Sequence, residues 1–140
     1  MLTVKYLVDF MEHARPEDLQ EVLVGSGRSF ADCPLTDLVK AGNLCLVDAE
    51  TDCVHAIGGI ANDNVIWMLC TDKVEQEPIK FLRFCKETLS YLLADKKVLY
   101  NTVWKENKLH VKWLKWMGAK FIKETDTHIL FTFRKEEADV

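Results

Sequence analysis

The six consecutive apolar residues Val65–Cys70 constrain the fold more than any other part of the sequence. An apolar run of this length without alternation is typical of a strand that is covered on both faces, near the centre of a sheet. A stretch with apolar residues at helical spacing follows, from about Gln76 to Asp95, and Val98–Trp104 then predicts another strand. Two strands joined through a long helix form a parallel crossover. The chain therefore predicts an α/β fold.

The part of the chain before this crossover predicts antiparallel strands. Leu44–Val47 and Cys53–Ala61 are strand-like, and Asn62-Asp63-Asn64 predicts a tight turn because these residues tolerate positive φ. The alternation in Leu2–Val8 predicts a further strand at the N-terminus. We therefore expect a meander of antiparallel strands ahead of the parallel unit.

Helix-start and helix-stop residues mark the shorter elements. Pro16 predicts the start of a helix that Gly25-Ser26-Gly27 ends, and Thr36 is a candidate N-cap for a short helix that ends at Lys40. Gly118 suits the end of a helix, because a residue in the left-handed conformation stops it at little cost. The last predicted elements are a helix over Leu109–Met117 and a hairpin of Ala119–Lys123 with Ile129–Phe133.

Composition limits the classes of protein that remain. The 140 residues are the usual size of one domain, so we expect a single domain over residues 1–140. The net charge of -4 argues against nucleic acid or an anionic membrane as partner, and no apolar stretch approaches the ~20 residues of a membrane span. The five cysteines are odd in number and lack a C-x-x-C pair. We therefore expect reduced thiols, no metal site and a cytosol-like compartment.

The segment Asn107–Phe121 places an asparagine before a short helix with several aromatic residues, followed by Gly118-Ala119. Together with the order of elements, this run resembles the GNAT (Gcn5-related N-acetyltransferase) superfamily. The resemblance implies a mixed central sheet with antiparallel N-terminal strands, a β-α-β crossover and helices on both faces. With His110 in the helix, the run is also similar to the GNAT-like proteins of short-tailed bacteriophages, which are associated with virion morphogenesis or the internal virion.

The GNAT resemblance implies a cofactor, acetyl-CoA or another acyl-CoA, in a slot between the Val65–Cys70 and Val98–Trp104 strands. In the family, the pantetheine amides pair with the backbone of the first of these strands, and the pyrophosphate rests on the loop that follows it. The positions that the resemblance implies for cofactor contact are Leu69, Cys70, Thr71, Lys73 and Asn107.

The loop at the pyrophosphate position, Thr71–Pro78, departs from the family pattern. It contains no glycine, and it sets three acids against one lysine. An acid about 6 Å from a phosphate costs on the order of 2–3 kcal/mol at an effective dielectric constant of about 20. The helix dipole returns only about 0.3–1 kcal/mol. The loop therefore disfavours ordinary binding of CoA.

The catalytic groups of the family are also incomplete. Leu114 stands where the family carries a tyrosine acid, and Val65–Cys70 lacks the usual glutamate base. Tyr100 and His110 are the nearest substitutes for the acid, because general acid catalysis needs a side chain that can give a proton. By residue type, the candidate bases are His55, Asp72 and His110.

Three functions remain open. The first is a phage-encoded acyltransferase-like protein that, if active, transfers an acyl group from acyl-CoA to an amine. The alternative is a non-catalytic virion-morphogenesis protein that keeps the GNAT fold, and the third is a binder of another small ligand in the same slot. These hypotheses imply a phage or host protein partner or a homodimer, in the cytoplasm of an infected bacterium or on the virion.

Overall fold

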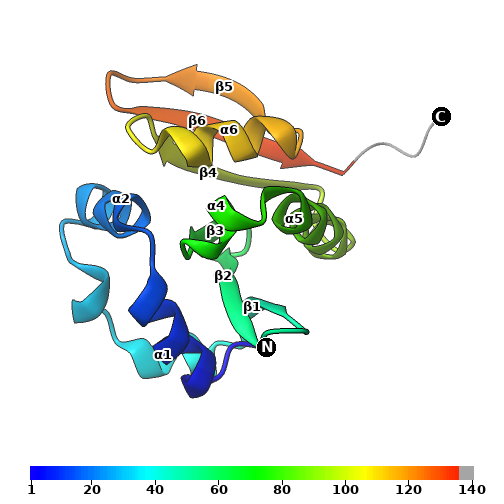
Figure 1. The fold of residues 1–140 in the computed structure, drawn as a ribbon. Helices are drawn as coiled ribbons and strands as arrows, with labels where there is room; N and C mark the ends of the chain where they lie inside the picture. The colour runs from blue at the N-terminus through cyan, green and yellow to red at the C-terminus, as the bar shows by residue number, and fades with distance from the viewer. Residues whose placement is uncertain (136–140) are drawn as a thin grey trace. The chain divides into compact units, whose positions relative to one another are not determined.

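The structure is a computed structural model that describes residues 1–135 (Figure 1). These residues form a mixed sheet of six strands in the order β1-β2-β3-β4-β6-β5, with the parallel neighbours β3 and β4 joined through α4 and α5. The expected mixed α/β fold with a β-α-β crossover is therefore confirmed. The helices are α1 (Val4–His13), α2 (Pro16–Ser26), α3 (Leu35–Lys40), α4 (Lys73–Gln76), α5 (Pro78–Leu93) and α6 (Lys108–Trp116), with one 3-10 turn, η1 (Phe30–Asp32). The strands are β1 (Leu44–Asp48), β2 (Cys53–Ala61), β3 (Val65–Cys70), β4 (Val98–Trp104), β5 (Lys120–Glu124) and β6 (His128–Arg134).

The chain divides into two compact units. Unit 1 comprises residues 1–60 and 67–78, and unit 2 comprises residues 61–66 and those from 79 on. The single domain expected over residues 1–140 stays a prediction. None of the helices in residues 1–135 has both the length and the apolar character that a membrane crossing requires.

The N-terminal strand expected at Leu2–Val8 is wrong, because α1 begins at Val4 and Thr3 is its N-cap. The Thr3 hydroxyl accepts a hydrogen bond from the Tyr6 backbone N–H at 3.4 Å, which is the interaction of an N-cap. Leu7 and Phe10, three residues apart, are both buried, as they must be on one face of a helix. In this segment the helical spacing of the apolar residues indicates the element correctly, and their short alternation does not.

The core of unit 1 lies where α1 packs against β2 and β3. Its most buried members come from the N-terminus, η1 and the two strands, and they are Leu2, Leu7, Phe10, Phe30, Val54, Ile57 and Leu69. Strands β2 and β3 approach closely at Gly58, where an added Cβ would lie 2.5 Å from the Trp67 carbonyl oxygen. The turn between these strands has Asn62 and Asp63 at positive φ, as expected.

The predicted ends of helices α2 and α3 are largely confirmed. Gly27 has a φ of 74° at the C-cap of α2, and its N–H donates to the Leu23 carbonyl. The exception is the N-terminus of α3, where Pro34 rather than Thr36 holds the N-cap position. Proline fixes the backbone φ angle at this position, and the helix has no side-chain cap.

In unit 2, the pairing of β3 with β4 starts as backbone pairing and continues through side chains. Val65 is opposite Tyr100, and the Tyr100 N–H donates to the Asn64 carbonyl at 3.0 Å. Beyond this point, Asn101 Nδ2 donates to the Ile66 carbonyl at 2.7 Å, so a side chain takes the place of a backbone donor. The parallel ladder within unit 2 is therefore short.

The rest of unit 2 is an antiparallel sheet covered by helices. Strand β6 pairs along its length with β4, from Val98 opposite Arg134 to Trp104 opposite His128, and β5 forms the neighbouring hairpin strand (Figure 1). Helix α6 ends as predicted before Gly118, which has a φ of 91°. The buried apolar side chains of this unit are Phe81, Cys85, Leu93, Leu99, Val103, Trp113, Leu114, Phe131 and Phe133.

Candidate functional site

The C-terminal end of β3 is bonded to the connection between α1 and α2. The Cys70 N–H donates to Asp18 Oδ2 at 2.6 Å, and the Cys70 carbonyl accepts from the Arg15 N–H at 3.0 Å. The Thr71 N–H donates in the other direction, to the His55 carbonyl on β2 at 2.9 Å. Because successive residues of a strand direct their backbone groups to opposite edges, the bonds of Cys70 lie on the edge of β3 away from β2.

The same connection continues along this edge. Ala14 and Thr71 form an antiparallel bridge, and the Asp72 N–H donates to the His13 carbonyl at 3.0 Å. From Cys70 to Asp72, the backbone groups that a ligand could use on this edge are therefore already paired within unit 1. This edge carries the backbone that the resemblance assigned to cofactor binding.

A buried ion network holds the connection in place. Arg15 and Asp18 are 5% and 1% exposed, and Arg15 Nη1 lies 2.5 Å from Asp18 Oδ1. Arg15 Nε also donates to Glu75 Oε1 at 2.8 Å, and Nη2 lies 3.2 Å from Glu17 Oε2. Burial opposes the charge of Arg15, but Asp18 and Glu75 outweigh it, so the pKa of the guanidinium is raised above its ordinary value.

Two acids of the Thr71–Pro78 loop have positive or ionisable neighbours in unit 1. Glu75 is paired with Arg15, and Glu77 Oε1 lies 3.5 Å from His55 Nε2. The expectation of three acids set against one lysine was incomplete, because residues far away in the sequence contribute to the charge of the loop. The absence of glycine from the loop stands.

Five of the predicted site residues lie in unit 1. Leu69, Cys70 and Thr71 are buried, whereas Asp72 is exposed and Lys73 is half-buried. The Thr71 hydroxyl donates to the Val54 carbonyl at 2.7 Å and accepts from the Lys73 N–H at 3.3 Å. Thr71 therefore ties the end of β3 to β2 and accepts from the first N–H of α4, so its hydroxyl already has structural partners.

The other three predicted site residues lie in unit 2. Tyr100 on β4 is 42% exposed, Asn107 at the N-cap of α6 is fully buried, and His110 within α6 is half-buried. Leu114, at the position of the family's tyrosine, is buried. A slot formed jointly by these residues and the end of β3 would lie between the units, and it stays a prediction.

Sequence reasoning missed Arg15 and Asp18, which hold the site together. A charged pair three residues apart at the start of a helix usually lies in solvent, so the pattern carried no sign of burial. His55, weighed as a candidate base, is fully buried. Burial of the Cys45 and Cys85 thiols raises their pKa to about 11 and about 12, which keeps them protonated and poorly nucleophilic.

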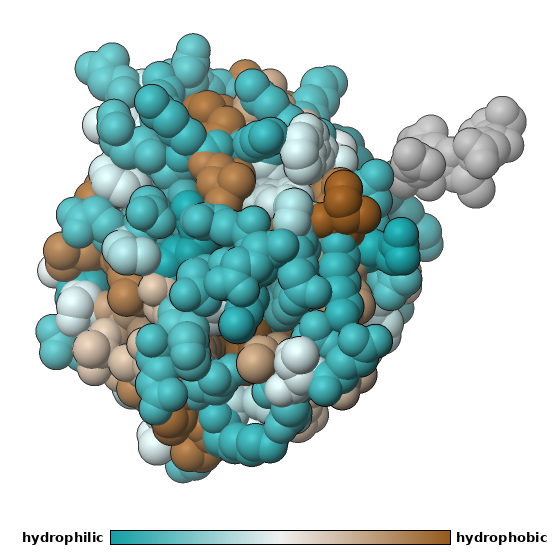
Figure 2. Space-filling model, viewed as in Figure 1, coloured by the Kyte–Doolittle hydropathy of each residue, from teal (hydrophilic) through white to brown (hydrophobic). Residues whose placement is uncertain are grey.

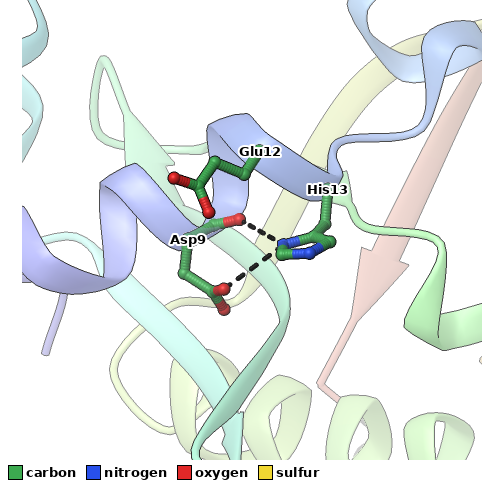
Figure 3. Close-up of side chains that lie close together, drawn as sticks. All are labelled: Asp9, Glu12 and His13. Atoms are coloured by element: carbon green, nitrogen blue, oxygen red, sulfur yellow. Dashed lines mark hydrogen bonds and ion pairs between the residues drawn. The ribbon is translucent and has the colours of Figure 1, made fainter.

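A second polar group lies on α1, where Asp9, Glu12 and His13 gather on one side of the helix (Figure 3). His13 Nδ1 donates to the Asp9 carbonyl at 3.0 Å and lies 3.3 Å from Asp9 Oδ1. The other Asp9 oxygen, Oδ2, accepts from the Val54 N–H at 2.8 Å and so ties α1 to β2. Because a carbonyl can only accept, His13 Nδ1 carries a proton there, and this atom is a donor rather than a metal ligand.

Comparisons with known proteins agree with this fold. Residues 44–126, more than half of the chain, match the model of a family described as bacteriophage T7, probable scaffold protein Gp13. No curated protein matches the sequence. The ribosomal-protein-S5-alanine acetyltransferase from Vibrio fischeri is similar in structure, with a TM-score of 0.59, 14% identity and coverage of 74% of this chain and 68% of that chain.

A second solved structure is similar to the same extent. It is an acetyltransferase (GNAT family) from Bacillus anthracis, with a TM-score of 0.56, 12% identity and coverage of 74% of this chain and 72% of that chain. At these identities the likeness shows the fold alone, and it confirms the expected GNAT-like fold.

Asp18 should be essential to the stability of unit 1. We expect Asp18→Asn to lower the free energy of unfolding by about 3 kcal/mol, because Arg15 then loses its one buried acidic partner among the three described and keeps only the half-exposed Glu17 and Glu75. Glu17→Gln is the matched control: Glu17 is 50% exposed, so its loss should change stability by less than about 1 kcal/mol. Urea unfolding followed by tryptophan fluorescence measures both, and equal effects would contradict the role of the buried pair.

His13 should make stability depend on pH. The hydrogen bond to the Asp9 carbonyl, aided by the charges of Asp9, Asp72 and Glu12, raises the pKa of His13 above 6.5 despite opposing desolvation. A group whose pKa is raised on folding stabilises the protein below its unfolded pKa and loses this contribution as pH rises through the folded pKa. His13→Gln should therefore be more destabilising at pH 5.5 than at pH 8.5. Thermal unfolding at both pH values tests this, and an equal loss at both would refute it.

Proposed function

The chain belongs to the family described as bacteriophage T7, probable scaffold protein Gp13, and on this premise we propose that it is a non-catalytic phage assembly protein. In this proposal the GNAT-like fold serves as a scaffold for contacts with another protein of the assembling particle. The protein acts in the infected cell and associates with the particle.

The observation that carries the proposal is the occupied edge of β3. In the enzymes that the fold resembles, this backbone pairs with the pantetheine arm of the cofactor. Here the Cys70 N–H donates to Asp18, and the Cys70 carbonyl accepts from Arg15. A ligand that took these groups would remove the Cys70 donor from the buried Asp18 Oδ2, and losing a hydrogen bond to a buried charged group costs about 1–3 kcal/mol or more.

Two further features support a non-catalytic role. The loop Thr71–Pro78 lacks the glycine that would let a backbone approach a pyrophosphate. Leu114, at the position of the family's acid, is buried and has no proton to give. Each feature removes a different part of the acyltransfer machinery.

A partner could bind at the apolar groove of unit 1. The groove has a volume of about 440 Å³, and apolar side chains of α1 and α3 form most of its wall, namely Val4, Leu7, Val8, Met11, Leu35 and Val39, with Glu12 and Thr36 beside them. Val4 and Val8 are 63% and 52% exposed, which is unusual for valines in a helix with a well-packed opposite face. Figure 2 shows separate hydrophobic patches on a largely hydrophilic face, in its upper part as well as in its lower part, where Figure 1 places α1. The occupant that we propose is an apolar helix face of a particle protein, since such grooves accept amphipathic helices.

The second candidate function is an acyl-CoA-dependent N-acyltransferase. The similarity to two solved acetyltransferases favours it. In that case Lys73 and Asn107 would contact the cofactor, and His110, Tyr100 and Asp72 would supply acid and base. Binding of acetyl-CoA separates this candidate from the proposed function.

Calorimetric titration with acetyl-CoA should give no saturable binding up to about 1 mM ligand. The reason is that the β3 edge is paired and the loop cannot enclose the phosphates. Saturable binding below about 100 μM would overturn the proposal. In that event, Lys73→Ala and Asn107→Ala should weaken binding if the family's contacts operate, and their failure to do so would place the ligand elsewhere.

Val8→Glu should reduce incorporation of the protein into particles, because it buries a charge against an apolar partner. Val24→Glu is the matched control, since Val24 is also a valine exposed on a helix of unit 1, at 42%, but lies outside the groove. The measurement is quantitative mass spectrometry of particles from cells that lack the natural protein and are supplied with each variant. If both variants are incorporated equally, the groove is not the contact surface. If particles that lack the protein have unchanged composition and infectivity, the assembly role is contradicted.

A further inference from the structure

Three side chains of metal-binding type converge in unit 1, and two of them form the His55–Glu77 contact described above. Asp48 is the last residue of β1, His55 lies on β2, and Glu77 lies between α4 and α5. One ligand atom from each lies within 4.8 Å of the other two. We propose that these residues form a binding site for one divalent transition-metal cation, such as Zn²⁺ or Mn²⁺.

The charges of the group call for a cation. Asp48 is 1% exposed and His55 is fully buried, so water screens them poorly. Two carboxylates with one imidazole carry a charge of about -1 if the imidazole is protonated and about -2 if it is neutral. A divalent cation bound by a neutral imidazole brings the sum to zero.

The separation between His55 and Glu77 suits direct coordination of one ion by both side chains. His55 Nε2 and Glu77 Oε1 are 3.5 Å apart. Bonds of about 2.0–2.2 Å to a tetrahedral ion place neighbouring ligand atoms about 3.3–3.6 Å apart, which matches this separation. Nitrogen and carboxylate oxygen are ligands for Zn²⁺ and Mn²⁺ alike, and the order of affinities favours Zn²⁺.

The surroundings provide orientation and access. Asp48 Oδ1 accepts a hydrogen bond from the Glu50 N–H at 2.9 Å, which fixes the direction of the carboxylate, as partners of metal ligands commonly do. The Glu77 side chain is 41% exposed, so an ion can enter from solvent on that side. A bound ion would tie β1 and β2 to Glu77, near the end of the Thr71–Pro78 loop.

Metal binding to the chelator-treated, desalted chain tests the proposal. Calorimetry with Zn²⁺, checked by elemental analysis after dialysis, should give one ion per chain. Glu77→Gln should weaken this binding by at least about tenfold, because it removes a ligand charge and keeps the shape of the side chain. Glu12→Gln is the matched control and should leave the affinity unchanged, since it alters the exposed acidic group on α1.

Two additional measurements separate coordination by the proposed ligands from binding to thiols. Mn²⁺ prefers oxygen and nitrogen ligands. Electron paramagnetic resonance should show that it binds the wild type and Glu12→Gln equally and Glu77→Gln more weakly. Zn²⁺ should shift the ring ¹⁵N resonances of His55 in the wild-type protein. The proposal is overturned if neither ion binds stoichiometrically up to about 1 mM, or if Glu77→Gln, shown to be folded by circular dichroism, binds as the wild type does.

Discussion

The buried carboxylate of Asp18 is the interaction on which the arrangement of unit 1 depends. One oxygen pairs with the Arg15 guanidinium, and the other accepts the Cys70 N–H at the end of β3. A buried charge is stable only if all of its partners are present, so the start of α2, the connection from α1 and the end of β3 must form together. Through Arg15 the same network reaches Glu75 in the loop that follows β3. One residue thus links helix, strand and loop.

This network also bears on how the fold is used. The GNAT-like fold alone does not determine an activity, since function resides in the groups at a site. In this chain the strand edge that would be available to a cofactor is bonded to the protein's own backbone and to a buried acid. Apolar residues of α1, namely Val4, Val8 and Met11, are exposed. Both features are grounds for the proposed assembly role.

Much of the fold could be predicted because its signals are local. The apolar run of β3, the turn at Asn62 and Asp63, and the glycine after α6 each act through neighbouring residues, and the structure places them as predicted. The N-terminal helix was mistaken for a strand because, over a few residues, its apolar residues fit both the spacing of a helix and the alternation of a strand. Its identity depends on Leu7 and Phe10 facing a core that forms from distant segments.

By itself, the sequence determined the α/β class, the order of most elements and the departure of the Thr71–Pro78 loop from the family pattern. These follow from propensities, apolar spacing and the presence or absence of particular residues. Only the tertiary structure decided that Arg15 meets Glu75 and that Asp48 and His55 meet Glu77, because these partners are 22 to 60 residues apart. Charged residues so far apart in the sequence come into contact only when packing brings their segments together. Local sequence patterns do not predict such contacts.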